Sequence, residues 1–268
     1  MRRAFKFRLF TNENQERELG AMLETHRRLY NACLEGRKTA YETEGKSVKY
    51  TDQSARFKDE RDTNPFYARL NFSSAQATMR RLDKAFQAFF RRVKAGEAPG
   101  YPRFKGRDRF DSVEFPKHGD GIRLTGNRLR VPHVGTIRVK VHREIAGTIK
   151  TATLKREAGK WFVVLSCDLG DVQVPENDKP AVGIDVGLEA FLTTTDGDRE
   201  PNPRYLKDAL PELRRKARSV SRKIKGSKRR RKAKHQLAKE SRHNKLSISL
   251  SWENRVVPLA VELVAPDR

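Results

Sequence analysis

A single acidic residue, Asp185, lies inside the apolar stretch from Ala181 to Leu188. The pattern predicts a short buried strand that carries one carboxylate. A second strand is expected from Glu189 to Thr195, followed by a turn at Asp196-Gly197. A carboxylate is costly to bury without a partner, and a divalent cation is a common partner. The residue types leave two interpretations open: a metal ligand, or a strand-end aspartate that caps a turn.

The chain carries a large excess of positive charge. Its 268 residues include 58 Lys and Arg against 34 Asp and Glu, which gives a net charge of +24. This excess indicates an anionic partner, and nucleic acid is the first candidate. No apolar run approaches the roughly 18 residues that span a bilayer, and the N-terminus lacks the apolar block of a signal peptide. We therefore expect a cytoplasmic protein with no membrane partner.

Alternating apolar residues predict strands in two separate parts of the chain. Residues 2–10 place Phe5, Phe7 and Leu9 on one face, and residues 112–170 contain several short alternating runs joined by glycine turns. Short strands joined by tight turns are typical of an antiparallel barrel or sandwich. The strand at 2–10 is expected to complete it, so the fold class is α+β with a helical insertion after the first strand.

Two amphipathic helices are expected within the insertion. One runs from Thr11-Asn12 to about residue 43, and its apolar face includes His26, which we interpret as a core histidine. The other begins at Ser73-Ser74 and ends before Gly96. Residues 44–72 are expected to be less regular. Cys33 and the distant Cys167 form no CxxC pair, so no zinc is expected in this chain.

Basic side chains gather in three places that could contact phosphates. A solvated basic surface is the alternative for the second helix, and an ordinary anchored loop is the alternative for residues 100–107. A long basic helix over residues 206–245 is the third place; it would be unstable alone because like charges repel, and a disordered basic tail is the alternative. The candidate nucleic-acid-binding residues are Arg80, Arg81, Lys84, Arg91 and Arg92 on the helix, Tyr101, Arg103, Phe104 and Lys105 in the loop, and Lys228, Arg229, Arg230, Arg231 and Lys232 in the basic helix.

Six stretches, in order, resemble the TnpB (OrfB) family of insertion-sequence proteins, which is similar to the type V CRISPR effector nucleases. They are residues 3–9, 29–31, 82–86 with 89–92, 100–105, 149–156 and 183–188. The resemblance implies a β-barrel wedge domain (1–10 and 111–175), a helical recognition insertion (11–110) and a partial RuvC-like nuclease domain of the RNase H type (181–268). It also implies a guide RNA and a target DNA as partners.

The same resemblance implies a nuclease site with three carboxylates and Mg²⁺. Asp185 matches the first carboxylate, and Glu262 is a candidate for the second, although Pro258 lies in the same predicted strand. The family's zinc ribbon and third carboxylate are missing, so a C-terminally truncated member with an incomplete site is expected. The alternatives are a nuclease-dead guided DNA- or RNA-binding protein, or an inactive remnant. The oligomeric state is not indicated.

Overall fold

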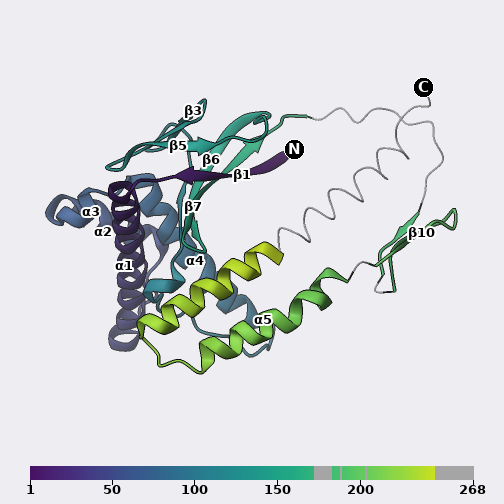
Figure 1. Cartoon of the computed structure of the whole chain (residues 1–268). Helices are drawn as coiled ribbons and strands as arrows, with labels where there is room; N and C mark the ends of the chain where they lie inside the picture. Colours follow the sequence, from purple (N-terminus) through teal and green to yellow (C-terminus); the bar gives the residue numbers. More distant parts are fainter. Residues whose placement is uncertain (172–182, 188, 203, 245–268) are drawn as a thin grey trace. The chain divides into compact units, whose positions relative to one another are not determined.

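The computed structural model describes residues 1–171, 183–187, 189–202 and 204–244. The chain divides into two compact units, Met1–Val172 and Gln173–Arg268, and each is described by itself (Figure 1). Glu262, the final apolar segment and nearly all of the expected linker at 171–180 lie outside the described residues.

The first unit contains a seven-stranded antiparallel sheet in the order β2-β6-β7-β1-β5-β4-β3. The N-terminal strand lies between β7 and β5, with Arg2 opposite Asp168 and Arg8 opposite both Phe162 and Lys140. The sheet is curled, but β2 and β3 form open edges, so the described strands make a partial barrel and not the closed barrel that was one expectation. The strands are β1 (Arg2–Phe10), β2 (Ser112–Phe115), β3 (Arg123–Thr125), β4 (Arg128–Val131), β5 (Gly135–Lys140), β6 (Thr148–Glu157) and β7 (Lys160–Asp168).

Four α-helices and a short 3₁₀ helix (Arg107–Arg109) are inserted between β1 and β2; the α-helices are α1 (Glu13–Glu44), α2 (Tyr50–Thr63), α3 (Pro65–Ala68) and α4 (Phe72–Lys94). The start of α1 is fixed by a capping box between Asn12 and Gln15, and its end by Gly45 in the left-handed conformation. The expectation of irregular structure at 44–72 was wrong. Asn64 caps α3, and Pro65 occupies the first turn of α3, where its missing N–H costs nothing.

One apolar core joins the sheet to the helices. Phe5, Phe7 and Leu9 are at most 3% exposed and pack in the same cluster as Leu23 of α1 and Leu82 of α4. The alternation in β1 and the helical spacing in α1 and α4 therefore bury the faces that the sequence predicts. This core fixes α4 beside β2, the edge strand of the sheet.

A buried polar group crosses the contact between α1 and α4. His26 is 1% exposed, and its Nδ1 lies 2.8 Å from the Thr78 hydroxyl. Burial lowers the pKa of His26 to about 3, so the imidazole is neutral in the folded protein. His26 is confirmed as a core residue. Both cysteines are free thiols, with Cys167 buried and Cys33 partly buried.

The second unit contains a small antiparallel sheet, β10-β9-β8, and a charged helical pair. The strands are β8 (Ile184–Asp185), β9 (Ala190–Thr194) and β10 (Arg199–Pro201), and α5 spans Tyr205–Ser221. The expected turn at Asp196-Gly197 is confirmed by a hydrogen bond from the Gly197 N–H to the Thr194 carbonyl. The prediction of a single helix over 206–245 was wrong. Helix α5 ends at Ser221, and residues 228–244 form a second helix. The turn between them contains Gly226 at φ 88°.

Candidate carboxylate site and nucleic-acid interface

Asp185 lies on β8, opposite Thr193 of β9. Gly183 is needed at the start of this strand because a Cβ there would lie 2.7 Å from the Thr195 side chain. The Gly183 N–H donates to the Thr195 hydroxyl at 3.1 Å, which fixes the register of β8 on β9. The strand is exposed along its described length, so the expectation of a buried strand was wrong. The reason is position: β8 is at the edge of the described sheet, and Ile184 remains 49% exposed.

The described residues supply one carboxylate at this site and no ligand set around it. In the described ranges, no group of three His, Cys, Asp or Glu side chains is arranged to hold a metal ion. Glu189, four residues along, is directed to an ion pair with Arg199 at 3.3 Å. These residues do not by themselves fit a magnesium site, so no catalytic step through a metal is derived from them. The second expected ligand, Glu262, lies outside the described residues.

The basic face of α4 is exposed and is partly held in place by aromatic and polar neighbours. Arg81 Nη1 donates to the Ser112 carbonyl at 3.3 Å, and its guanidinium lies 5.1 Å from the centre of the Phe110 ring. Arg80 Nε donates to the Tyr50 hydroxyl at 3.2 Å. Lys84 is exposed one turn further along the helix. Three cations therefore lie together beside the edge strand β2.

The other two candidates on α4 lie at its C-terminal end. Arg91 and Arg92 are both exposed, and the Arg92 guanidinium lies 3.9 Å from the Glu97 carboxylate. An exposed pair at that distance contributes little to stability, so both guanidinium groups are accessible to an external anion.

The loop at 100–106 combines the two interpretations that its sequence allows. Its backbone is anchored, because Asn31 bonds to both the N–H and the carbonyl of Lys105, at 2.8 and 3.0 Å. Tyr101 packs edge-on against Phe86 and Phe89 of α4, yet it stays 43% exposed. Burial raises the pKa of the Tyr101 hydroxyl.

The tip of this loop points outward. Phe104 is 50% exposed, and Arg103 is also exposed. An aromatic ring beside a cation on an anchored loop suits stacking on a base with a neighbouring phosphate neutralised. The structure therefore leaves Phe104 and Arg103 available for this role, while Tyr101 and Lys105 are partly engaged within the protein.

A cationic hollow lies between α1, residues 107–110 and β6. It has a volume of about 310 Å³ and is lined in part by Arg27, Arg107, Arg156 and Glu24. Hydrogen bonding from Arg27, with a smaller contribution from Arg28, lowers the pKa of Glu24 to about 2. Sequence reasoning missed this hollow because its cations come from three separate segments, none of which is a basic run.

The run Lys228–Lys232 begins the helix at 228–244 and is not the centre of one long helix. Arg230 is partly buried, and its Nη1 donates to the Lys223 carbonyl at 2.7 Å, which closes the turn between the two helices. The other four side chains of the run are exposed. Lys216 of α5 joins the pair through Glu240 at 2.6 Å.

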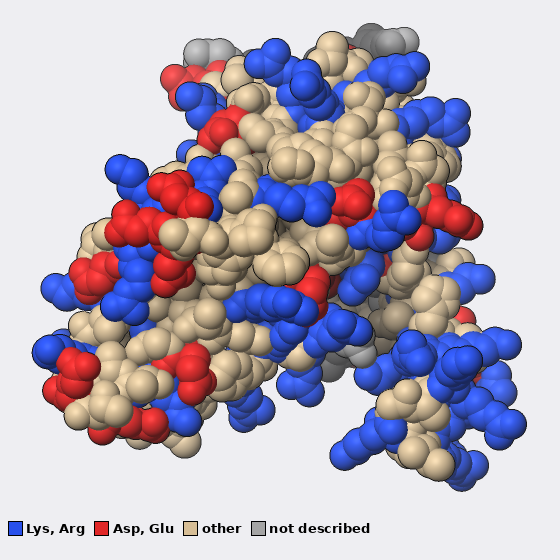
Figure 2. All heavy atoms as spheres, turned by 90° about the vertical axis from the view of Figure 1, so that its left-hand side faces the viewer, with Lys and Arg blue, Asp and Glu red and all other residues tan. Residues whose placement is uncertain are grey.

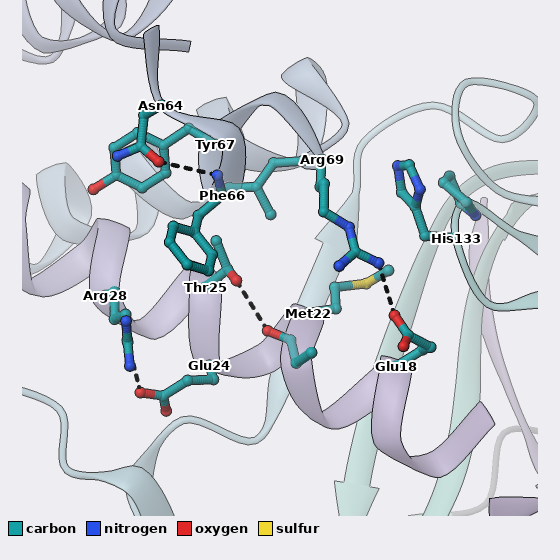
Figure 3. A pocket seen from close by; sticks show the side chains of 13 residues that line it. Glu18, Met22, Glu24, Thr25, Arg28, Asn64, Phe66, Tyr67, Arg69 and His133 are labelled. Carbon is teal, nitrogen blue, oxygen red and sulfur yellow. Dashed lines mark hydrogen bonds and ion pairs between the residues drawn. The ribbon is translucent and has the colours of Figure 1, made fainter. Parts of the chain in front are cut away.

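A hollow of about 390 Å³ on the other side of α1 has a different character (Figure 3). Its charged groups are already paired, Glu18 with Arg69 at 2.8 Å and Glu24 with Arg28 at 3.1 Å. The Thr25 hydroxyl donates to the Ala21 carbonyl. Because these polar groups satisfy one another, this hollow offers no net charge for a phosphate.

Charge is distributed unevenly along the chain. Residues 11–72, which include α1 to α3, contain 11 Lys and Arg and 11 Asp and Glu, whereas residues 205–244 contain 16 and 3. Figure 2 shows acidic and basic side chains interspersed on the side of the molecule that carries α1 to α3. The excess positive charge of the chain is therefore carried largely by other segments, including α4, the 100–110 loop and residues 205–244.

Two family models match parts of the chain. Residues 164–248 match the OrfB_IS605 family, described as a probable transposase, and residues 1–46 match the helix-turn-helix domain of the same proteins. In this chain residues 2–10 and 13–44 form β1 and α1, a strand followed by one long helix. The domain name therefore does not describe the local structure here.

Two curated relatives cover most of the chain. A "Putative RNA-guided DNA endonuclease" of Streptomyces pristinaespiralis is 30% identical over 96% of the chain. "Putative RNA-guided DNA endonuclease InsQ" of Escherichia coli is 27% identical over 84%. The chain spans 66% of the first relative and 55% of the second.

Solved structures show a more distant likeness. "Cryo-EM structure of the Cas12f1-sgRNA-target DNA complex" aligns with 98% of this chain and 70% of its own, at 14% identity and a TM-score of 0.37. A second, "Cryo-EM structure of CRISPR-Cas12f Ternary Complex", aligns with 93% and 61%, at a TM-score of 0.39. Over residues 1–46 and 164–248, the chain is therefore similar to the OrfB (TnpB) family of insertion-sequence proteins.

Proposed function

We propose that this chain is a transposon-associated nucleic-acid-binding protein of the RNA-guided DNA endonuclease type, with a guide RNA and a target DNA as partners. The observation that carries the proposal is the uneven charge. Cations of α4, the 100–106 loop and residues 205–244 are exposed, while residues 11–72 are neutral overall. Cations concentrated in particular segments indicate that the phosphate backbone of a nucleic acid binds along defined surfaces. An even distribution of charge would instead indicate non-specific binding over the whole protein.

The domain roles that follow are part of the proposal. Residues 1–10 and 111–175, which include the curled sheet, act as the wedge, and residues 11–110, which include the inserted helices, recognise nucleic acid. Residues 181–268 correspond to part of a RuvC-like nuclease domain. In the described part of the chain no helix is long and apolar enough to cross a membrane.

Within the nuclease domain, Asp185 is the proposed catalytic carboxylate and Mg²⁺ ligand, with Glu262 as a candidate partner. Asp185 suits this role in two respects: its strand is held in register by Gly183 and Thr195, and its carboxylate is open to solvent.

A second candidate function is guided binding without cleavage. It is favoured by the single carboxylate at β8, since the described residues bring no other ligand to Asp185. Both functions share the RNA and the target and differ only in the nuclease step.

One experiment separates these functions. The purified protein is incubated with RNA from the element end, Mg²⁺ and a plasmid with a matched target; binding and cleavage are both measured. Cleavage that disappears in Asp185→Ala, but persists in the matched turn variant Asp196→Ala, supports the endonuclease. Target retention without cleavage supports guided binding. If element-end RNA is bound no better than unrelated RNA, both functions are excluded.

A further inference from the structure

A hollow of about 340 Å³ lies where α4 meets the edge of the sheet. Helix α4 contributes a cationic wall, and strands β2 and β6 contribute an opposite wall that holds two hydroxyls and a carboxylate. The hollow is lined by Ala77, Thr78, Arg80, Arg81, Lys84, Ser112, Glu114 and Thr153. Its volume is at the small end of the roughly 300–1,000 Å³ typical of ligand sites.

The cationic wall keeps unused donors. Both hydrogen bonds of Arg81 to Ser112 use Nη1, at 3.3 and 3.4 Å, and a guanidinium has five N–H donors. Arg80 uses Nε and Nη2 for Tyr50 and Gln76. The Lys84 ammonium group makes no hydrogen bond or ion pair with any residue that the structure describes. The two arginine side chains are therefore held in place by the protein, and the three cationic groups together still have donors free to bind a phosphate.

The opposite wall is set by strand register. Glu114 of β2 pairs directly with Thr153 of β6, so both side chains point to the same face of the sheet. Ser112 lies two residues before Glu114 and shares that face. Val113 and Phe115, which alternate with them, are buried in the core. The two strands thus direct two hydroxyls and one carboxylate into the hollow.

The carboxylate of Glu114 distinguishes this hollow from a plain phosphate site. Glu114 is exposed and forms no ion pair with a described residue, although three cations line the same hollow. An ionised carboxylate only accepts hydrogen bonds, and it would repel a phosphate. A ligand that suits the whole hollow therefore has an anionic group for α4 and a hydroxyl or amino donor for Glu114.

A ribonucleotide has both groups at a fixed spacing. We propose that this hollow binds one ribonucleotide unit of the bound RNA. Its phosphodiester lies against Arg80, Arg81 and Lys84, and its 2′-hydroxyl donates to Glu114. A deoxyribose lacks this donor and leaves the carboxylate unpaired beside a phosphate, so the hollow distinguishes RNA from DNA at one position. This inference rests on the proposed function and adds a specific contact to it.

The test is a scan of single 2′-deoxy substitutions along the element-end RNA, with affinities measured for the full-length wild-type protein and for Glu114→Ala. In wild type, one position should lose about tenfold in affinity when its hydroxyl is removed, as expected for a hydrogen bond to a charged group. In Glu114→Ala, the same position should lose nothing. Because Glu114 is exposed, Glu114→Ala should fold like the wild type, and circular dichroism checks this.

Two further variants separate this contact from general electrostatics. Glu144→Ala removes another exposed carboxylate of the same unit and should leave the deoxy profile unchanged. Lys84→Ala should weaken RNA and DNA equally and reduce the salt slope by about 0.7. A deoxy profile that is identical in wild type and Glu114→Ala would overturn the inference. Failure of the wild type to prefer element-end RNA would instead refute the proposed function.

Discussion

The two long helical pairs of this protein are built in opposite ways. Helices α1 and α4 each bury a row of side chains, including Leu19 and Leu23 of α1 and Met79 and Leu82 of α4. Helix α5 has no buried residue, and its pairing with residues 228–244 includes the ion pair from Lys216 to Glu240. Ion pairs that water can still reach contribute little to the stability of the folded state. The first pair is a structural element, whereas the second is a surface that a polyanion would stabilise.

Core truncation should give the largest effect. Leu82 is fully buried between α4 and the sheet, so Leu82→Ala should lower the free energy of unfolding by about 2–5 kcal/mol. The matched change Leu213→Ala in α5, where the side chain is only partly buried, should cost less than half as much. Denaturant unfolding measures both values. Equal losses would show that the second pair also depends on burial.

Removing the basic run should mainly affect binding. With Lys228 to Lys232 replaced by Gln, RNA affinity should fall about a hundredfold near 0.1 M salt. The salt slope should decrease by up to about 3.5, because each phosphate contact on a single strand contributes about 0.7. The thermal midpoint of the first unit should not change. The control removes the same charge from the neutral region and should lose far less affinity: Arg17, Lys38, Lys46, Lys49 and Lys58 to Gln.

Acid should destabilise the first pair through His26. The pKa of His26 is about 3 in the folded state and about 6.5 when unfolded, so only the unfolded chain binds a proton between these values. Stability should fall by up to about 1.4 kcal/mol per pH unit from pH 6 to pH 4. His26→Gln should remove this contribution, while His142→Gln, at an exposed position, should retain it. Unfolding curves at several pH values give the slopes.

The smallest effect is expected between α5 and the following helix. Glu240→Gln removes one partner of Lys216, which keeps Glu212 at 3.2 Å. The loss in unfolding free energy should be below about 1 kcal/mol. Bound RNA should reduce this loss further, because phosphates would neutralise the exposed cations. A loss well above 1 kcal/mol in free protein would contradict the contrast between the two pairs.

Periodicity was sufficient for most of the first unit. The spacing of Leu19, Leu23 and Leu34 predicted α1, and the alternation of Phe5, Phe7 and Leu9 predicted β1 and its buried face. Helix α2 was missed because it buries only Phe57, so it has almost no apolar stripe to detect. The break after Ser221 was missed because the charge is equally dense on both sides of Gly226.

The candidate site was less predictable than the fold. The cations of α4 follow from helical spacing, but Ser112, Glu114 and Thr153 reach the same hollow only through the β2–β6 register. Exposure of Asp185 could not be predicted, because an apolar strand pattern does not reveal whether the strand lies at an edge. The roles of Asp185 and Glu262 in catalysis remain predictions.

The central position of β1 has a consequence for how the protein folds during synthesis. Its pairing of greatest sequence separation joins Arg2 to Asp168 of β7. The strand that is synthesised first therefore cannot complete its pairing until the last strand of the sheet has been synthesised. Helices α1 and α4 rely on contacts much nearer in sequence and can form earlier. Until β7 leaves the ribosome, β1 has an unpaired edge, and the basic Arg2, Arg3, Lys6 and Arg8 on that strand disfavour edge-to-edge association of nascent chains.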